Sequence, residues 1–275
     1  MAIFIYLAVS LLSAILFVPL FDELLRSLGH LQHNYRGKMI PQSMGIVFLP
    51  VFFLSAAWAN FTGILSGFVV TRLALVVGGF GVLGMVDDIW GDSRARGLGG
   101  HVKRLLFHGE ITTGLSKAIF GFAVSLWAVS GLPGIFLLIV WRAVLIALSA
   151  NLLNLLDLRP GRAIKSFLLL SFFYIWQVSG ELGALILFPF WLASLVYLPW
   201  DLKGRGMLGD AGANVLGGVL GLAIVLTAPA AFQVGYLAAL VSIHVLAERV
   251  SFTKAIAANT FLRFLDTLGR EGWEK

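Results

Sequence analysis

The chain contains no cysteine, and this absence excludes disulfide bonds, thiolate nucleophiles and thiolate metal ligands. Charged residues are also scarce, since they make up 12% of the 275 residues, about half of the share in a typical soluble domain. The remainder is strongly apolar, with 59% hydrophobic residues and a mean hydropathy of +0.93. The composition therefore predicts an integral membrane protein in which oxygen or imidazole ligands would hold any metal ion.

Acidic residues are fewer than basic ones, which gives a net charge of +6 and an isoelectric point near 9.8. Such a charge can indicate nucleic-acid binding, but the basic residues lie in short connections between long apolar runs. Membrane topology explains this distribution, so we expect no nucleic-acid partner. The first apolar run follows no basic segment and precedes no small-residue cleavage site, so we expect a retained first span.

Apolar segments recur along the chain, most of them long enough to cross a hydrocarbon core of ~30 Å. They predict nine spans, near residues 2–20, 43–59, 65–86, 114–131, 134–156, 164–178, 182–199, 212–228 and 231–249. Of the 20 Lys and Arg residues, all but Arg72 and Arg142 lie in or beside alternate connections, near 21–42, 87–113, 157–165 and 200–211, or in the tail 249–275. The positive-inside rule then places these segments in the cytoplasm and the N-terminus outside.

Arg72 and Arg142 each lie about eight residues, or ~12 Å of helix, inside the outer end of a predicted span. We favour side chains that snorkel to the interface, and the alternative is an intramembrane ion pathway. The predicted fold is thus an all-α, polytopic transmembrane bundle of about nine spans over residues 1–250. In the cytoplasmic tail, 251–275, apolar residues at helical spacing predict an amphipathic helix that lies on the membrane surface or covers a site.

Two adjacent carboxylates, Asp87 and Asp88, stand at the end of a run of about twenty apolar residues. Carboxylates beside a membrane span are costly to desolvate, so they favour a metal or phosphate site. Asp157 and Asp210 fall in other connections on the same predicted side. A single cytoplasmic site assembled from several connections is therefore possible.

Asn151, Asn154 and Asp157 form a polar stripe, because residues at steps of three are neighbours on a helix surface. Helix capping is the alternative explanation of this stripe. Gly209-Asp210-Ala211-Gly212 opens the eighth predicted span, where Asp210 either caps the helix or holds a cation that bridges diphosphate oxygens.

These motifs, in this order and on alternate connections, resemble those of the polyprenyl-phosphate N-acetylhexosamine-1-phosphate transferases, the family of phospho-MurNAc-pentapeptide translocase. The resemblance spans roughly residues 1–249. The segment from Arg36 to Gly45, which includes Lys38, looks like the family's basic segment followed by Pro and Met-Gly. Lys117 resembles the family's lysine at the entrance to the fourth span. Both lysines would pair with phosphates, or they are positive-inside anchors.

The resemblance implies transfer of a sugar-1-phosphate from a nucleotide diphosphate sugar, typically a UDP-sugar, to undecaprenyl phosphate in a bacterial cytoplasmic membrane. Asp210 and Asp87 would hold Mg²⁺, or Mn²⁺ in its place, and Asp88 would orient or deprotonate the lipid phosphate. Asn154 and Asp157 would position the nucleotide sugar or a metal-bound water, with Asn151 as a further binding residue. The family habit of dimerising also suggests a homodimer.

Two departures from the family's pattern favour an alternative. Asp157 is followed by Leu158-Arg159-Pro160-Gly161-Arg162, so a second carboxylate is replaced by arginines that would favour phosphate. The His-rich loop before the last span is absent. The alternative is therefore a non-catalytic relative that binds polyprenyl phosphate or partners a cell-envelope assembly. His101, after two glycines, would clasp the nucleotide diphosphate or belong to a solvated basic loop. A transporter is disfavoured by the apolar middles of the spans.

Overall fold

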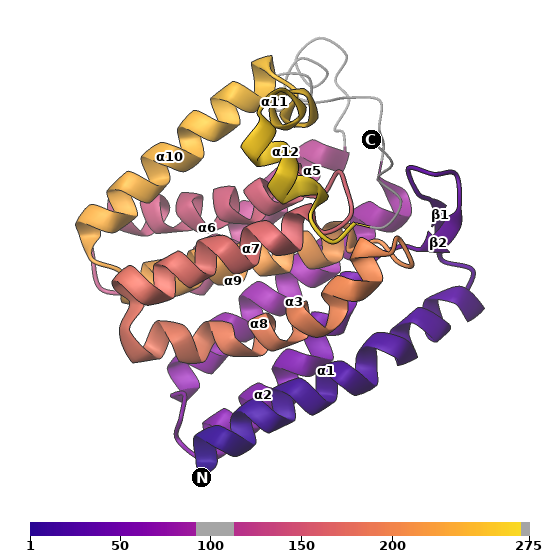
Figure 1. Cartoon of the computed structure of the whole chain (residues 1–275). Coiled ribbons are helices and arrows are strands. Elements are labelled where there is room, and N and C mark those ends of the chain that lie inside the picture. Colours follow the sequence, from indigo (N-terminus) through magenta and orange to yellow (C-terminus); the bar gives the residue numbers. More distant parts are fainter. Residues whose placement is uncertain (92–112, 271–275) are drawn as a thin grey trace.

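The computed structural model describes residues 1–91 and 113–270, which fold into a bundle of helices (Figure 1). The all-α prediction is confirmed, because the described sheet is a single short antiparallel hairpin. The elements are α1 (Ala2–Ser27), β1 (Leu31–His33), β2 (Met39–Pro41), the 3₁₀ helix η1 (Met44–Val47), α2 (Phe48–Phe61), α3 (Gly67–Trp90), α5 (Thr113–Val129), α6 (Phe136–Leu156), α7 (Arg162–Tyr174), the π-helical segment η2 (Ile175–Ser179), α8 (Gly180–Leu202), α9 (Gly209–Thr227), α10 (Ala230–Arg249), α11 (Phe252–Ala258) and α12 (Thr260–Thr267).

Seven helices in the described part of the chain are long and apolar enough to cross a membrane. They are α1, α2 together with η1, α3, α6, α8, α9 and α10. Helix α5 is apolar but shorter, and α7 runs directly into η2. These helices indicate a membrane protein, whereas the count of nine spans and their orientation stay predictions.

Helix α9 lies at the centre of the bundle, and 89% of its apolar 18-residue stretch is buried. Glycines on α9 let neighbouring backbones come close, as small residues commonly do in membrane bundles. A Cβ added at Gly217 would lie 2.2 Å from the carbonyl oxygen of Ser149 on α6. Any larger residue at position 217 would therefore clash with the backbone of α6.

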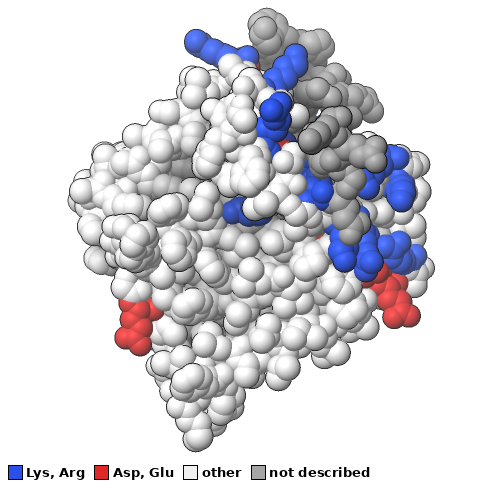
Figure 2. Space-filling view, in the orientation of Figure 1, with Lys and Arg blue, Asp and Glu red and all other residues white. Residues whose placement is uncertain are grey.

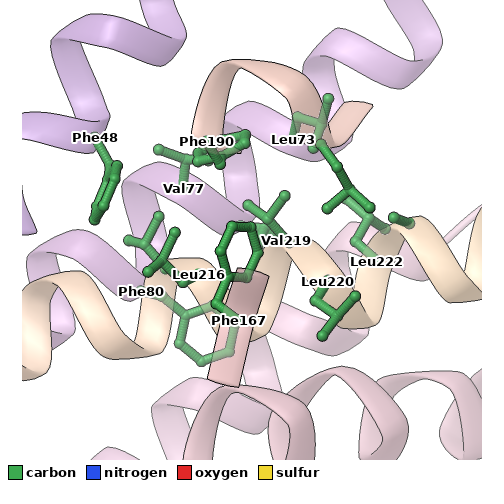
Figure 3. Packing of buried hydrophobic residues seen from close by; sticks show 14 of the residues in the cluster. Phe48, Leu73, Val77, Phe80, Phe167, Phe190, Leu216, Val219, Leu220 and Leu222 are labelled. Atoms are coloured by element: carbon green, nitrogen blue, oxygen red, sulfur yellow. The ribbon is translucent and has the colours of Figure 1, made fainter. Parts of the chain in front are cut away.

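Apolar side chains from several helices meet around α9 (Figure 3). Phe80 of α3, Phe167 of α7 and Phe190 of α8 are all buried, together with Leu216 and Val219 of α9. Because lipid tails are as apolar as these side chains, close van der Waals packing stabilises the bundle more than transfer out of water does. The core thus fixes α3, α7 and α8 relative to α9.

The two ends of the bundle differ in charge. Figure 2 shows Lys and Arg side chains gathered at the end that carries the hairpin and the C-terminal tail. Toward the opposite end, the Arg72 guanidinium donates to the Ser130 carbonyl at 2.8 Å, and Arg142 donates to the Pro133 carbonyl at 2.8 Å. Both arginines reach the connection between α5 and α6, which agrees with the snorkelling interpretation.

Two boundaries differ from the prediction. Helix α1 continues to Ser27, beyond the predicted end at residue 20, because an Asp22–Arg26 ion pair of 3.1 Å and a buried Leu25 extend it. The tail is two helices instead of one. Asn259 interrupts it and caps α12, since its Oδ1 accepts from the Leu262 amide at 3.0 Å.

Candidate functional site

Asp88 joins the end of α3 to the beginning of α9. Its carboxylate accepts from the backbone amides of Asp210 at 3.0 Å and Ala211 at 3.2 Å. Gln42 Nε2 also approaches it, at 3.4 Å. The first amides of a helix lack partners within the helix and carry a positive dipole, so a carboxylate there is stabilised. Asp88 therefore acts as an N-cap supplied from another helix, and its predicted role toward the lipid phosphate stays a prediction.

Ser43 and His30 hold the Asp88 carboxylate from the other side. Ser43 Oγ donates to Asp88 Oδ2 at 2.6 Å, and His30 Nε2 lies 2.9 Å from Ser43 Oγ. Because the hydroxyl's single proton is given to Asp88, His30 Nε2 carries the proton of the second bond. Ser43 has a left-handed backbone with φ of 61°, which directs its hydroxyl at this point. Sequence reasoning missed both residues.

Lys117 bridges the two carboxylates that were predicted to hold a metal ion. Its Nζ donates to Asp87 Oδ2 at 3.1 Å and also contacts Asp210 Oδ2. Asn154 completes the cluster when its amide is oriented to satisfy both neighbours, donating to Asp210 Oδ1 at 2.8 Å and accepting from Lys117 Nζ at 2.8 Å. The side chains of Lys117, Asp87 and Asp210 are 18%, 22% and 26% exposed, so solvent reaches this cluster.

A pocket of about 220 Å³ opens beside these carboxylates. Its lining combines Asp88, Asp157 and Asp210 with Arg159 and with residues of the β1–β2 hairpin. Burial raises the pKa of Asp157 well above its ordinary value, and the charges of the neighbouring carboxylates raise it further. The predicted residues from three separate stretches of the chain thus line one cavity.

Asp201 is a further acidic residue of the pocket that sequence reasoning did not select. It is 3% exposed and accepts from the Gly161 backbone amide at 2.8 Å. This bond fixes the turn between α6 and α7, in which Gly161 adopts a φ of 77° that glycine accommodates readily. The available signal was an acidic residue at the end of an apolar run, as at Asp87.

Arginines approach the pocket over an aromatic ring. The guanidinium carbons of Arg159 and Arg36 lie 5.4 Å and 5.1 Å from the centre of the Tyr35 ring, within the range of cation–π contacts. Tyr35 and Arg159 both line the pocket. Arg159 therefore places a cation beside the acidic cluster.

Other predicted residues lie outside this cluster. Asn151 is exposed on α6, and Lys38 is exposed on the hairpin connection. Arg162 is 5% exposed and pairs with Asp266 of the tail, at 2.7 Å. His101 lies outside the described residues. The substrate-binding roles of these four residues stay predictions.

Close backbone contacts set the position of the cluster. A Cβ added at Gly84 of α3 would lie 2.4 Å from the Asp210 carbonyl and the Ala211 amide nitrogen. A Cβ added at Gly45 would lie 2.1 Å from Cα of Gly212. Glycines therefore let both α3 and η1 touch the first turn of α9.

The donor set suits a divalent cation. Mg²⁺ is commonly bound through one or two carboxylates together with substrate phosphates and water. Asp87 and Asp210 already face one shared cation, the Lys117 ammonium, and the Asn154 amide lies beside them. In residues 1–91 and 113–270, no group of three or more His, Asp or Glu side chains forms a metal site. A metal here would thus depend on Asp87, Asp210 and the substrate's phosphates.

Comparisons with known proteins add nothing to the family resemblance, which therefore depends on the sequence motifs alone. No family model matches the chain, and no curated protein matches it either.

Proposed function

We propose that the protein transfers a sugar-1-phosphate from a nucleotide diphosphate sugar to a polyprenyl phosphate. The expected donor is a UDP-linked N-acetylhexosamine, and the expected acceptor is undecaprenyl phosphate. The products are a lipid diphosphate sugar and UMP. The proposal joins the motif resemblance to the site's geometry.

One observation carries the proposal. Asp88, Asp210 and Asp157 come from separate stretches of the chain and line one pocket, and Lys117 holds Asp87 to Asp210 beside it. Buried or half-buried carboxylates are costly to gather, so such a cluster marks a functional site more often than it stabilises a fold.

The reaction forms one bond and breaks one. An oxygen of the lipid phosphate attacks the phosphorus that carries the sugar, and the bond from this phosphorus to the bridging oxygen breaks. The electron pair leaves with UMP. A phosphate monoester is ionised near neutral pH, so the step needs alignment and charge neutralisation more than a strong base.

Basic, amide and acidic side chains of the site would have different roles in this reaction. Lys117 and Arg159 would pair with phosphate oxygens, and Asn154 would donate a hydrogen bond to the nucleotide sugar. Asp87 and Asp210 would hold Mg²⁺, which supplies charge neutralisation at the diphosphate when bound. Asp88 fixes the first turn of α9, and this keeps Asp210 in place.

We infer the orientation of the bundle from the distribution of its charge. The end of the bundle that carries the pocket is basic, since it holds Arg159, Arg205 and the arginines of the tail. By the positive-inside rule, this end would face the cytoplasm. Nucleotide sugars are made in the cytoplasm of bacteria, so the pocket would open on the side of its donor. We therefore expect the membrane to be the bacterial inner membrane.

The test uses purified protein with UDP-GlcNAc, undecaprenyl phosphate and Mg²⁺, followed by measurement of UMP. We expect release by the wild type and a loss of about a hundredfold or more in Asp210→Asn, since one electrostatic group is removed from the site. Glu181→Gln, an exposed acidic residue of α8, is the control. Equal release by wild type and Asp210→Asn would refute the proposal.

A non-catalytic protein that binds lipid phosphate is the second candidate. The contact of the Lys117 ammonium with both Asp87 and Asp210 favours it, because a side-chain cation already neutralises these carboxylates. Binding of undecaprenyl phosphate without UMP release, across several nucleotide sugars, would support this candidate over the transferase.

A further inference from the structure

Helix α12 presents an apolar face to the outside of the molecule. Phe261, Phe264 and Leu268 are 67%, 58% and 52% exposed. Their spacing of three and four residues places them on one side of the helix. Two large apolar side chains exposed on α12, with a third directly after its end, indicate a surface that meets a partner.

The opposite side of α12 is fixed to the protein by a buried ion cluster. Asp266 accepts from Arg162 Nε at 2.7 Å and Nη2 at 3.0 Å, and from Arg270 Nη2 at 3.1 Å. The side chains of Arg162, Asp266 and Arg270 are 5%, 9% and 0% exposed. A bidentate pair with so little exposure fixes rotation about the helix axis. The apolar face is therefore held outward.

The end of α12 is also hydrogen-bonded to the first turn of α7 and to the turn that precedes α7. Lys165 Nζ donates to the carbonyls of Leu265 and Asp266, each at 2.7 Å, where a helix C-terminus favours a cation. The Arg270 guanidinium donates to the Pro160 carbonyl at 2.9 Å and 3.1 Å. Since Pro160 lines the pocket, the tail is attached to the pocket's wall.

The surroundings of α12 identify the partner. Helix α10 leads to the tail and ends in exposed apolar residues, with Val245 and Leu246 52% and 56% exposed (Figure 1). The apolar surface thus continues from a candidate membrane span onto the tail. Lys254 and Arg263 are exposed on the tail. Figure 2 shows Lys and Arg side chains gathered at the end of the bundle that carries the tail. Exposed cations beside an apolar face suit anionic head groups.

We propose that α12 is an interfacial helix whose partner is a bilayer surface containing anionic lipids. Phe261, Phe264 and Leu268 enter the boundary between head groups and acyl chains, where amphipathic helices are buried by ~5–10 Å. Asp266 holds the other side of the helix on the protein. The inference is independent of the transferase reaction, because it uses none of the pocket's carboxylates.

The absence of cysteine makes a direct test possible. Phe264→Cys and the adjacent Arg263→Cys are labelled with a fluorophore in the full-length protein, which is placed in nanodiscs of phosphatidylcholine with phosphatidylglycerol. Quenching by brominated lipid is compared with quenching by iodide in the water phase. Both positions are exposed, so labelling should preserve the fold, and the two labels sample different sides of α12.

We expect the label at position 264 to be quenched by brominated lipid about threefold more than the label at position 263, and iodide to show the reverse. The added substitution Asp266→Asn should reduce this contrast, because the helix loses its fixed rotation. Equal iodide quenching at both positions would overturn the proposal. Protection of position 264 from both quenchers would also overturn it and would indicate a second copy of the chain.

Discussion

Substitution of Gly84 tests whether the contact between α3 and α9 positions the site. A methyl group at Gly84 would lie 2.4 Å from the backbone of Asp210 and Ala211, whereas ordinary contact begins at 3.4 Å. The two helices must therefore separate by about 1.0 Å in Gly84→Ala. The same shift would lengthen the bond of 3.0 Å from the Asp210 amide to Asp88 beyond hydrogen-bonding distance.

The energetic cost follows from these two losses. Overpacking costs about 1–3 kcal/mol, and a lost hydrogen bond to a charged group costs about 1.5–3 kcal/mol. Gly78→Ala is the matched control, because Gly78 lies on the same helix and an added Cβ meets nothing within 4 Å. Both variants gain the same helix propensity, so the comparison isolates the contact. We expect Gly84→Ala to be less stable than Gly78→Ala by about 3 kcal/mol.

The assay is thermal unfolding in detergent, followed by intrinsic tryptophan fluorescence. A deficit of about 3 kcal/mol corresponds to a midpoint lower by about 6–12 °C. UMP release should fall by about a hundredfold, since a displacement near 1 Å misplaces reacting groups. If Gly84→Ala matched Gly78→Ala in both midpoint and activity, the contact between α3 and α9 would not position the site.

Three further outcomes are expected. Asp88→Ala should lower the midpoint by about 4–8 °C, the effect of ~2 kcal/mol for a lost cap with unpaired amides, whereas Asp22→Ala, which breaks an i,i+4 ion pair with Arg26, should change it little. Lys117→Met should remove the ammonium that Asp87 and Asp210 share, so Mg²⁺ should raise its midpoint more than that of the wild type. Asp266→Asn should expose the tail to limited proteolysis. The pKa of Asp266 lies below its ordinary value of 3.8, because the hydrogen bonds and charges of Arg162 and Arg270 outweigh burial. The ion cluster therefore stabilises the folded tail above pH 3.8, and this contribution is lost as the pH falls through the folded-state pKa of Asp266.

Each of these outcomes can fail in a distinct way. An unchanged midpoint in Asp88→Ala would mean that the α9 amides find other partners. Equal Mg²⁺ effects on Lys117→Met and wild type would remove the carboxylate pair from the metal proposal. Tail proteolysis that is the same for Asp266→Asn and wild type between pH 4 and 7 would show that the ion cluster does not hold α12.

Sequence patterns predicted the helical bundle and much of the cluster for a physical reason. A carboxylate at the end of an apolar run, such as Asp87 or Asp210, has few alternatives to a polar site, because hydrocarbon excludes it. Alternation of basic connections further placed these residues on one side of the membrane. The convergence of Asp88, Asp157 and Asp210 on one pocket agrees with that reasoning.

The rest depended on contacts that no local pattern specifies. Ser43 joins the cluster through a side-chain hydrogen bond to Asp88, 45 residues further along the chain, and His30 joins it through Ser43. Asp201 faces the pocket because the last turn of α8 meets the turn at Gly161. Arg162 pairs with Asp266 of the tail, a contact that no local pattern indicates, and its predicted substrate-binding role stays a prediction. Periodicity fixes which residues share a helix face and leaves open which helix that face meets.

The most direct test of the central claim is Mn²⁺ binding to purified protein, followed by electron paramagnetic resonance in the presence of a nucleotide diphosphate sugar. If Asp87 and Asp210 form a cation site with substrate phosphates, the wild type should bind one Mn²⁺ per chain. Asp210→Asn should lose this signal, and Glu181→Gln should keep it. Equal binding by wild type and Asp210→Asn would contradict a cation site at the junction of α3 and α9.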